Sequence, residues 1–168
     1  MHYTHREVRY HEDVASLFAH VGGLEAPDSV LLESADITTR SGLQSVAVLR
    51  ASLRVTCRGN RVTVQPLTPS GEVIAADLEL EQFRVGGHTY EFPASQAADE
   101  RERLTAPSSA DVLRALTTRA GYGNEDFPFL AGGFAYDYLD SFEQLPAVEA
   151  GPNTYPDFQF ALAEVLLR

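Results

Sequence analysis

The sequence has no tryptophan, a single cysteine and few basic residues among its 168 positions. One cysteine, Cys57, excludes an internal disulfide and a cysteine metal cluster, which agrees with a reducing compartment. The 13 Lys and Arg stand against 24 Asp and Glu, and the resulting formal charge of -11 repels nucleic-acid phosphates and anionic lipids. We therefore expect no nucleic-acid partner and no binding to a charged membrane surface.

Long apolar runs are also absent. The longest, residues 160–167, is interrupted by Glu164 and is far shorter than the roughly 20 residues of a membrane helix. No basic segment followed by an apolar one opens the chain, so no leader is expected. With 44% hydrophobic residues, the sequence predicts one globular cytoplasmic domain.

The pattern of apolar residues predicts one α+β domain in which short strands accompany three helices. Residues 13–21 have helical spacing after Asp13, whose side chain suits a helix cap, and the pattern stops at Gly22-Gly23. Gly59-Asn60 separates two alternating runs and predicts a β-hairpin. The other expectations are strands at 29–34, 45–50, 53–58, 61–65 and 88–92, helices over 72–83 and from Ser108 or Ser109 to Gly121, and a surface loop at 94–107, with or without a helical turn.

The stretch from Pro128 to Pro146, PFLAGGFAYDYLDSFEQLP, is rich in aromatic residues. At its centre is Gly132-Gly133, where the absence of side chains lets another backbone or a ligand come close. Composition alone favours the simpler interpretation, an aromatic core strand with a β-bulge at the glycines.

Residues 30–36, VLLESAD, place two carboxylates and a hydroxyl directly after three apolar residues. Such a strand end can bind a ligand. Alternatively, Glu33 and Asp36 simply face water while Ser34 forms a local turn bond. The residue types alone favour this second interpretation, because polar side chains are common in the turns that end strands.

Three segments together resemble a known family: LLESADITTRSGLQSVAVLRASLRVTCRGNRVTVQPL, GGFAYDYLDSFEQLP and YPDFQFALAEVLL. In order and spacing they are similar to the amino-terminal region of anthranilate synthase component I, which makes anthranilate from chorismate in tryptophan biosynthesis. The resemblance runs from about residue 9 to the last residue. It implies that residues 1–168 are the amino-terminal domain of a larger layered α/β/β/α fold, with mostly antiparallel sheets and three flanking helices.

The resemblance also implies that the catalytic part of the enzyme is missing from this chain. In the family, the chorismate site, the carboxylates that bind Mg²⁺ and the catalytic histidine and lysine lie in the carboxyl-terminal region. We therefore expect no catalytic residue and no metal or cofactor site in residues 1–168, and no activity of this segment by itself. The apolar run Phe158–Leu167, followed only by Arg168, fits a truncated chain. The complete enzyme would work with a glutamine amidotransferase subunit, component II.

What the resemblance assigns to the amino-terminal region is feedback inhibition. Most relatives are inhibited by tryptophan, which binds beside the LLES turn, and matching positions place Leu32, Glu33 and Ser34 at that site. The residue types suit the ligand, because Glu33 can accept from an ammonium group, Ser34 can donate to a carboxylate and Leu32 can contact an indole. Gln44 is a further candidate at a position where many relatives have a lysine, which leaves an ionic contact there in doubt.

Two alternatives stay open on the sequence alone. The chain could be a free-standing, non-catalytic ligand-binding or interaction module of the same fold, or it could be the corresponding part of aminodeoxychorismate synthase component I. Because an isolated amino-terminal region would expose strand edges, we also expect two copies to pair through those edges as a homodimer.

Overall fold

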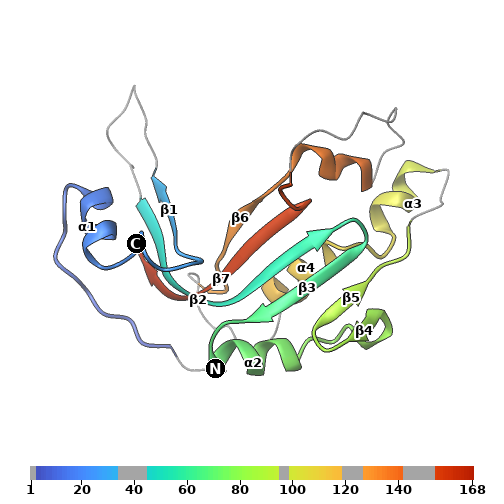
Figure 1. Ribbon diagram of the computed structural model, residues 1–168, viewed down its shortest axis with the longest axis horizontal. Helices are drawn as coiled ribbons and strands as arrows, with labels where there is room; N and C mark the ends of the chain where they lie inside the picture. The colour runs from blue at the N-terminus through green and yellow to red at the C-terminus, as the bar shows by residue number, and fades with distance from the viewer. Residues whose placement is uncertain (1–2, 34–44, 95–98, 119–126, 142–153) are drawn as a thin grey trace.

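The structure, a computed structural model, describes residues 3–33, 45–94, 99–118, 127–141 and 154–168 (Figure 1). The strands in these ranges are β1 (Val30–Glu33), β2 (Ser45–Arg58), β3 (Arg61–Pro66), β4 (Arg84–Gly86), β5 (Thr89–Glu91), β6 (Leu130–Phe134) and β7 (Phe158–Leu167). The helices are α1 (Val14–His20), α2 (Pro69–Ala76), α3 (Glu100–Thr105) and α4 (Asp111–Thr118), with 3₁₀ turns η1 (Glu81–Phe83) and η2 (Tyr136–Ser141). The expected α+β class with a mostly antiparallel sheet is confirmed.

The long strand β2 is the axis of the sheet, whose order is β4-β5-β3-β2-β7-β6. On one side, β7 runs antiparallel along nearly all of β2, from the pair Ala47 and Leu167 to the pair Cys57 and Phe158. On the other side, β3 pairs only with residues 53–58 and β1 only with residues 45–48. β1 therefore lies at the far end of β2 from the hairpin that joins β2 to β3.

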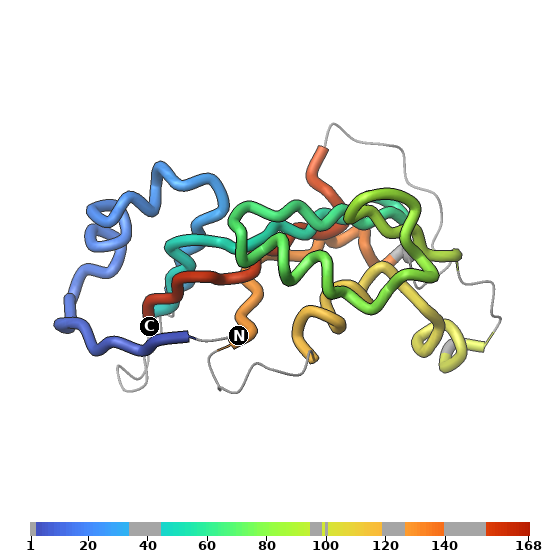
Figure 2. Tube along the Cα trace, turned by 90° about the horizontal axis from the view of Figure 1, so that it is seen from below, coloured from blue at the N-terminus to red at the C-terminus, as the bar shows by residue number. Residues whose placement is uncertain are grey.

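One face of the sheet packs on helices α2 and α4 to form the main core (Figures 1 and 2). Alternate residues of β2 point into this core, and its largest fully buried side chains include Tyr90, Phe92 and Phe158. Helix α2 begins directly on β2, because the backbone N–H groups of Leu67 and Thr68 donate to the carbonyl of Ser52 at 2.8 and 3.2 Å.

The opposite face carries a smaller apolar cluster made mostly of alanine. It consists of Val48, Ala51, Ala131, Ala161 and Ala163, with partly buried Val30, Phe127, Phe129 and Leu166 packed against it. Alternation along β7 separates the two faces, since Phe160 and Leu162 contribute to the main core while Ala161 points the other way. The small side chains leave this face shallow.

Several local predictions are confirmed. Helix α1 begins after Asp13, whose side chain accepts a hydrogen bond from the backbone N–H of Ser16 at 2.9 Å. The turn between β2 and β3 is the predicted hairpin, with Gly59 at a φ of 61° that favours glycine. The expected strand at 88–92 is β5, and α3 supplies a helical turn within the expected loop at 94–107.

Other predictions are wrong. The helix expected over 72–83 ends at Ala76, because the chain turns after Asp77 and buries Leu78 and Leu80 in the main core. The strands expected at 45–50 and 53–58 are one strand, and β4 was missed. Ser109 does not cap α4; its hydroxyl lies 3.0 Å from the buried hydroxyl of Tyr138.

The expected β-bulge at Gly132-Gly133 is also wrong, because β6 pairs with β7 in continuous register from Leu130 to Phe134. Gly132 has a different reason to be glycine. An added Cβ would lie 2.7 Å from the Cα of Phe160 and 2.8 Å from an atom of its ring, whereas at Gly133 the space is open. The irregular pairing lies instead between β2 and β7, around residues 48–53. In the described sheet β4, β6 and β1 each pair with one strand only, and pairing of two copies through such edges stays a prediction.

Candidate functional site

The LLES segment lies at the open end of the β1 and β2 pair. In this pair Leu32 is opposite Val46, and Glu33 is opposite Ser45. Both Leu32, at 48% exposure, and Glu33 are accessible to solvent. The other two candidates, Ser34 and Gln44, belong to residues 34–44 and lie outside the described residues.

Leu32 and Glu33 face opposite sides of the strand, because successive side chains in a β-strand alternate. Glu33 lines a pocket, but Leu32 does not. Of the two predicted site residues that the structure describes, Glu33 lies at this pocket. The structure leaves Leu32 on the other face, next to the start of the undescribed segment.

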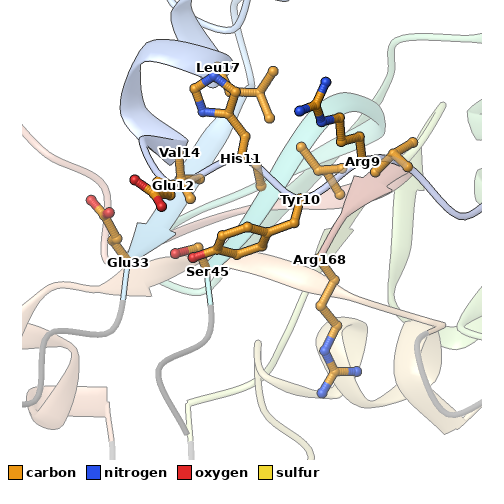
Figure 3. A pocket seen from close by; sticks show the side chains of 12 residues that line it. Arg9, Tyr10, His11, Glu12, Val14, Leu17, Glu33, Ser45 and Arg168 are labelled. Atoms are coloured by element: carbon orange, nitrogen blue, oxygen red, sulfur yellow. The ribbon is translucent and has the colours of Figure 1, made fainter. Parts of the chain in front are cut away.

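The pocket has a volume of about 520 Å³, within the range typical of small-molecule sites (Figure 3). We call residues 3–12, which have no regular secondary structure, the amino-terminal arm. The walls of the pocket are arm residues 8–12, Val14 and Leu17 of α1, Glu33, Ser45 and Ala47 of the sheet, and the last two residues of the chain. Residues distant in sequence thus meet at the end of the sheet where β1 ends and β2 begins.

The pocket separates charges of opposite sign. Figure 3 shows Glu12 and Glu33 at one end, Arg9 at the other, and Tyr10 between them with its hydroxyl directed toward Ser45. The apolar side chains of Val14 and Leu17 form part of the wall. This arrangement can hold a molecule that carries both charges and an apolar group.

The arm reaches this position through contacts at both of its ends. Near its start, the rings of Tyr3 and Phe127 stack with 6.1 Å between their centroids. At its end, the backbone N–H of Asp13 donates to Nδ1 of His11 at 3.2 Å. Hydrogen bonds from the Ser16 hydroxyl and backbone N–H hold the pKa of Asp13 below its ordinary value, so the carboxylate form caps α1 near neutral pH.

Helix α1 is in turn packed on the turn that leads to β1. Phe18 is buried and packs on Gly23, where an added Cβ would lie 2.5 Å from the nearest atom of the Phe18 ring. The hydroxyl of Ser29, just before β1, donates to the carbonyl oxygens of Gly23 and Ala26. The turn that connects α1 to β1 is therefore closed by its own hydrogen bonds.

An ion pair ties the start of β1 to the middle of β2. The guanidinium of Arg54 donates from two nitrogens to both carboxylate oxygens of Asp28, with 2.6 Å between Nη2 and Oδ2. The side chain of Asp28 is only 9% exposed, and its backbone φ of 127° is rare for a residue other than glycine. The hydrogen bond to Asp28 raises the pKa of Arg54 above its ordinary value.

No group of three or more His, Cys, Asp or Glu side chains is placed to hold a metal ion in the described part of the chain. Among those residues, no helix has the length and apolar character needed to cross a membrane.

Comparison with known proteins shows which family the chain is similar to. The chain is 37% identical over 171 aligned residues to anthranilate synthase component 1 of Serratia marcescens, 36% to that of Escherichia coli and 34% to that of Salmonella typhimurium. Each alignment covers 96% of this chain. The chain corresponds to the amino-terminal region of anthranilate synthase component 1. The resemblance found in the sequence is confirmed.

The chain spans about a third of the length of these curated relatives, 33% for the Serratia protein and 32% for the other two. No protein-family model matches the sequence. Sequence reasoning found the LLES segment but missed the arm side of the pocket and the Asp28 to Arg54 pair. The arm shows neither helical nor strand periodicity, and Asp28 and Arg54 are too far apart in sequence to be paired by inspection.

Proposed function

We propose that this chain is the amino-terminal regulatory and scaffold part of an anthranilate synthase component I, and that it contributes to a site for feedback inhibition by tryptophan. The observation that supports the proposal best is the similarity over 96% of the chain. The aligned region includes the LLES segment, whose Glu33 lines a pocket at the open end of β1. The complete enzyme would convert chorismate, with ammonia or glutamine, to anthranilate and pyruvate.

The chemistry of tryptophan sets what such a site must provide. Burying about 200 Å² of indole stabilises the complex by about 5 kcal/mol, and association itself costs a comparable amount. Contacts with the two charged groups of the amino acid must supply the rest. Glu33 can accept hydrogen bonds from the ammonium, while Ser34 and Gln44, with Leu32 for the ring, remain proposed contacts.

The proposal places the chemical step outside this chain. The described residues offer no carboxylate group suited to Mg²⁺, so we assign that ion to the region of the relatives that this chain does not match. The component II subunit that would supply ammonia belongs to the complete enzyme as well. Residues 1–168 alone should form no anthranilate from chorismate.

The test uses the complete product of the gene, including whatever follows the codon for Arg168. Anthranilate fluorescence is measured with chorismate, Mg²⁺ and ammonia, over a series of tryptophan concentrations. We expect the wild type to be active and inhibited, and Glu33→Gln to remain active with an inhibition curve shifted to higher tryptophan. Glu79→Gln, the same change at an exposed position between α2 and η1, is the matched control.

Three results would contradict the proposal: no anthranilate from the complete protein, no inhibition of the wild type, or the same curve for Glu33→Gln and Glu79→Gln. A gene that stops at Arg168 would favour the free-standing module instead. A product identified as aminodeoxychorismate would move the chain to the related enzyme.

A further inference from the structure

We propose that an internal water molecule bridges the hydroxyl of Tyr90 and the guanidinium of Arg84, where the hairpin of β4 and β5 meets the main core (Figure 1). The water would tie the outermost hairpin of the described sheet to that core. This site shares no residue with the pocket beside Glu33, and it does not depend on the proposed function.

Buried polar atoms without a partner are concentrated in this hairpin. In the described part of the chain, five buried side-chain nitrogen or oxygen atoms make no hydrogen bond, and four of them belong to three residues of the hairpin. These four are Nε and Nη2 of Arg84, Nδ1 of His88 and the hydroxyl oxygen of Tyr90. Because buried polar groups in folded proteins are nearly always bonded to protein or to ordered water, their concentration indicates a hydrated site.

The hydroxyl of Tyr90 is shielded from bulk solvent and needs a partner inside the protein. Tyr90 is 0% exposed and is among the largest fully buried side chains of the core. Burial raises the pKa of Tyr90, so the hydroxyl keeps its proton near neutral pH and can both donate and accept. Leaving such a group unpaired would cost more than a hydrogen bond normally contributes to stability.

Arg84 supplies donors beside this hydroxyl. It pairs with Tyr90 across the two strands, and its Cζ lies 5.4 Å from the centre of the Tyr90 ring. Nη1 donates to the carbonyl of Gly87 at 3.1 Å, while Nη2 lies 2.7 Å from the Glu81 carboxylate in an ion pair without hydrogen-bond geometry. The face of the ring attracts the guanidinium but cannot satisfy the hydroxyl at the ring edge. One water molecule can accept from Arg84 and from the hydroxyl and donate to Glu81.

The experiment measures native-state hydrogen exchange of the complete gene product in a peptide that covers β4 and β5. Tyr90→Phe keeps the ring under the guanidinium and removes only the hydroxyl. Because a hydrogen bond to water is lost, exchange in this peptide should become about tenfold faster. Tyr138→Phe is the matched control: its buried hydroxyl lies 3.0 Å from that of Ser109, so the same change should accelerate exchange around η2 by a similar factor.

Two arginine backgrounds test whether Arg84 shares the water. In Arg84→Met the bridge is already broken, so adding Tyr90→Phe should change exchange by less than about twofold. Arg61→Met is the control background, because Arg61 bonds to Glu91 and lies on the other face of the sheet from the main core. There the effect of Tyr90→Phe should remain about tenfold.

Unchanged or slower exchange in Tyr90→Phe would overturn the proposal, because removal of an unpaired hydroxyl relieves its desolvation cost. An equal effect of Tyr90→Phe in both arginine backgrounds would overturn the bridge to Arg84. A crystal structure of the complete protein tests the site directly. It should show a water oxygen within about 3.2 Å of the Tyr90 hydroxyl and of Nε or Nη2 of Arg84, and density without that water would contradict the proposal.

Discussion

Replacing Arg54 with methionine should lower the free energy of unfolding by more than the loss of an exposed ion pair would. Methionine keeps an apolar stem of similar length, so the change mainly removes the guanidinium that bonds to both oxygens of Asp28. Removing one partner of a buried ion pair typically costs 3–5 kcal/mol, because it leaves an uncompensated charge. Since Arg54 is 29% exposed and Asp28 is 9% exposed, some water reaches the pair, and we expect a loss of about 2–3 kcal/mol.

The measurement is urea unfolding of residues 1–168 followed by circular dichroism, with the free energy of unfolding taken from the midpoint and slope. Arg61→Met is the control, because Arg61 also bonds to a carboxylate across strands, that of Glu91 at 2.7 Å. That pair is 60% and 38% exposed, so its loss should cost under about 1 kcal/mol.

A second variant tests the stated cause. Asp28→Asn in the Arg54→Met background removes the unpaired carboxylate and should recover part of the lost stability. The reasoning is refuted if Arg54→Met and Arg61→Met lose the same free energy within about 0.5 kcal/mol, or if the double variant is less stable than Arg54→Met alone.

Three further predictions follow from single positions. Gly132→Ala should destabilise the chain by at least about 2 kcal/mol, because the new methyl group would clash with the backbone of β7. Gly133→Ala places its methyl group in open space and should change stability little. Urea unfolding compares the two variants directly, and equal losses of stability would contradict the packing argument. Burial raises the pKa of the Cys57 thiol from 9.0 to about 11, so the thiol of the unfolded chain ionises first as the pH rises. The contribution of Cys57 to the free energy of unfolding should be constant below about pH 8 and should fall by about 2–3 kcal/mol between pH 9 and 11. Cys57→Ala should remove this part of the pH dependence of stability. If Ser34 donates to the tryptophan carboxylate, Ser34→Phe in the complete protein should weaken inhibition by more than tenfold without lowering anthranilate formation; an unchanged inhibition curve in the active variant would return Ser34 to a turn residue.

The parts of the fold that were predicted correctly have local causes. A side-chain cap at Asp13 and two turn residues at Gly59-Asn60 act within a few residues of themselves, so sequence reasoning finds them. The end of α2 has a tertiary cause. Residues 78–83 continue the apolar spacing of a helix, but Leu78 and Leu80 reach the main core only if the chain turns after Asp77.

The glycine pair in β6 shows the same limit. Its sequence correctly signals that another backbone or a ligand comes close, and the neighbour is the backbone of β7 at Gln159 and Phe160, without the expected bulge. Which neighbour fills the space depends on strand register, and the register of β6 against β7 is set by residues about 30 positions apart.

For the candidate site, the sequence supplied the residue types and the structure supplied their neighbours. Family resemblance drew attention to Leu32 and Glu33, but only the fold shows that they face opposite sides of β1 and that Glu33 meets the arm. The arm residues could not be predicted as pocket residues from the sequence, because their pattern does not indicate which part of the sheet they contact.

One end of β1 is anchored to β2 by an ion pair, the other end carries Glu33, and the anchor helps to set the position of Glu33. At its start, Asp28 is fixed to Arg54, and the four strand residues that follow are hydrogen-bonded to β2, so Glu33 has a defined position before any ligand arrives. Fixing a binding group in advance reduces the ordering cost of association, which is a large fraction of the free energy available to a small ligand. On this argument, variants that break the Asp28 to Arg54 pair should weaken tryptophan inhibition of the complete protein although neither residue lines the pocket. Unchanged inhibition in a folded Arg54→Met protein would mean that pairing with β2 alone positions Glu33.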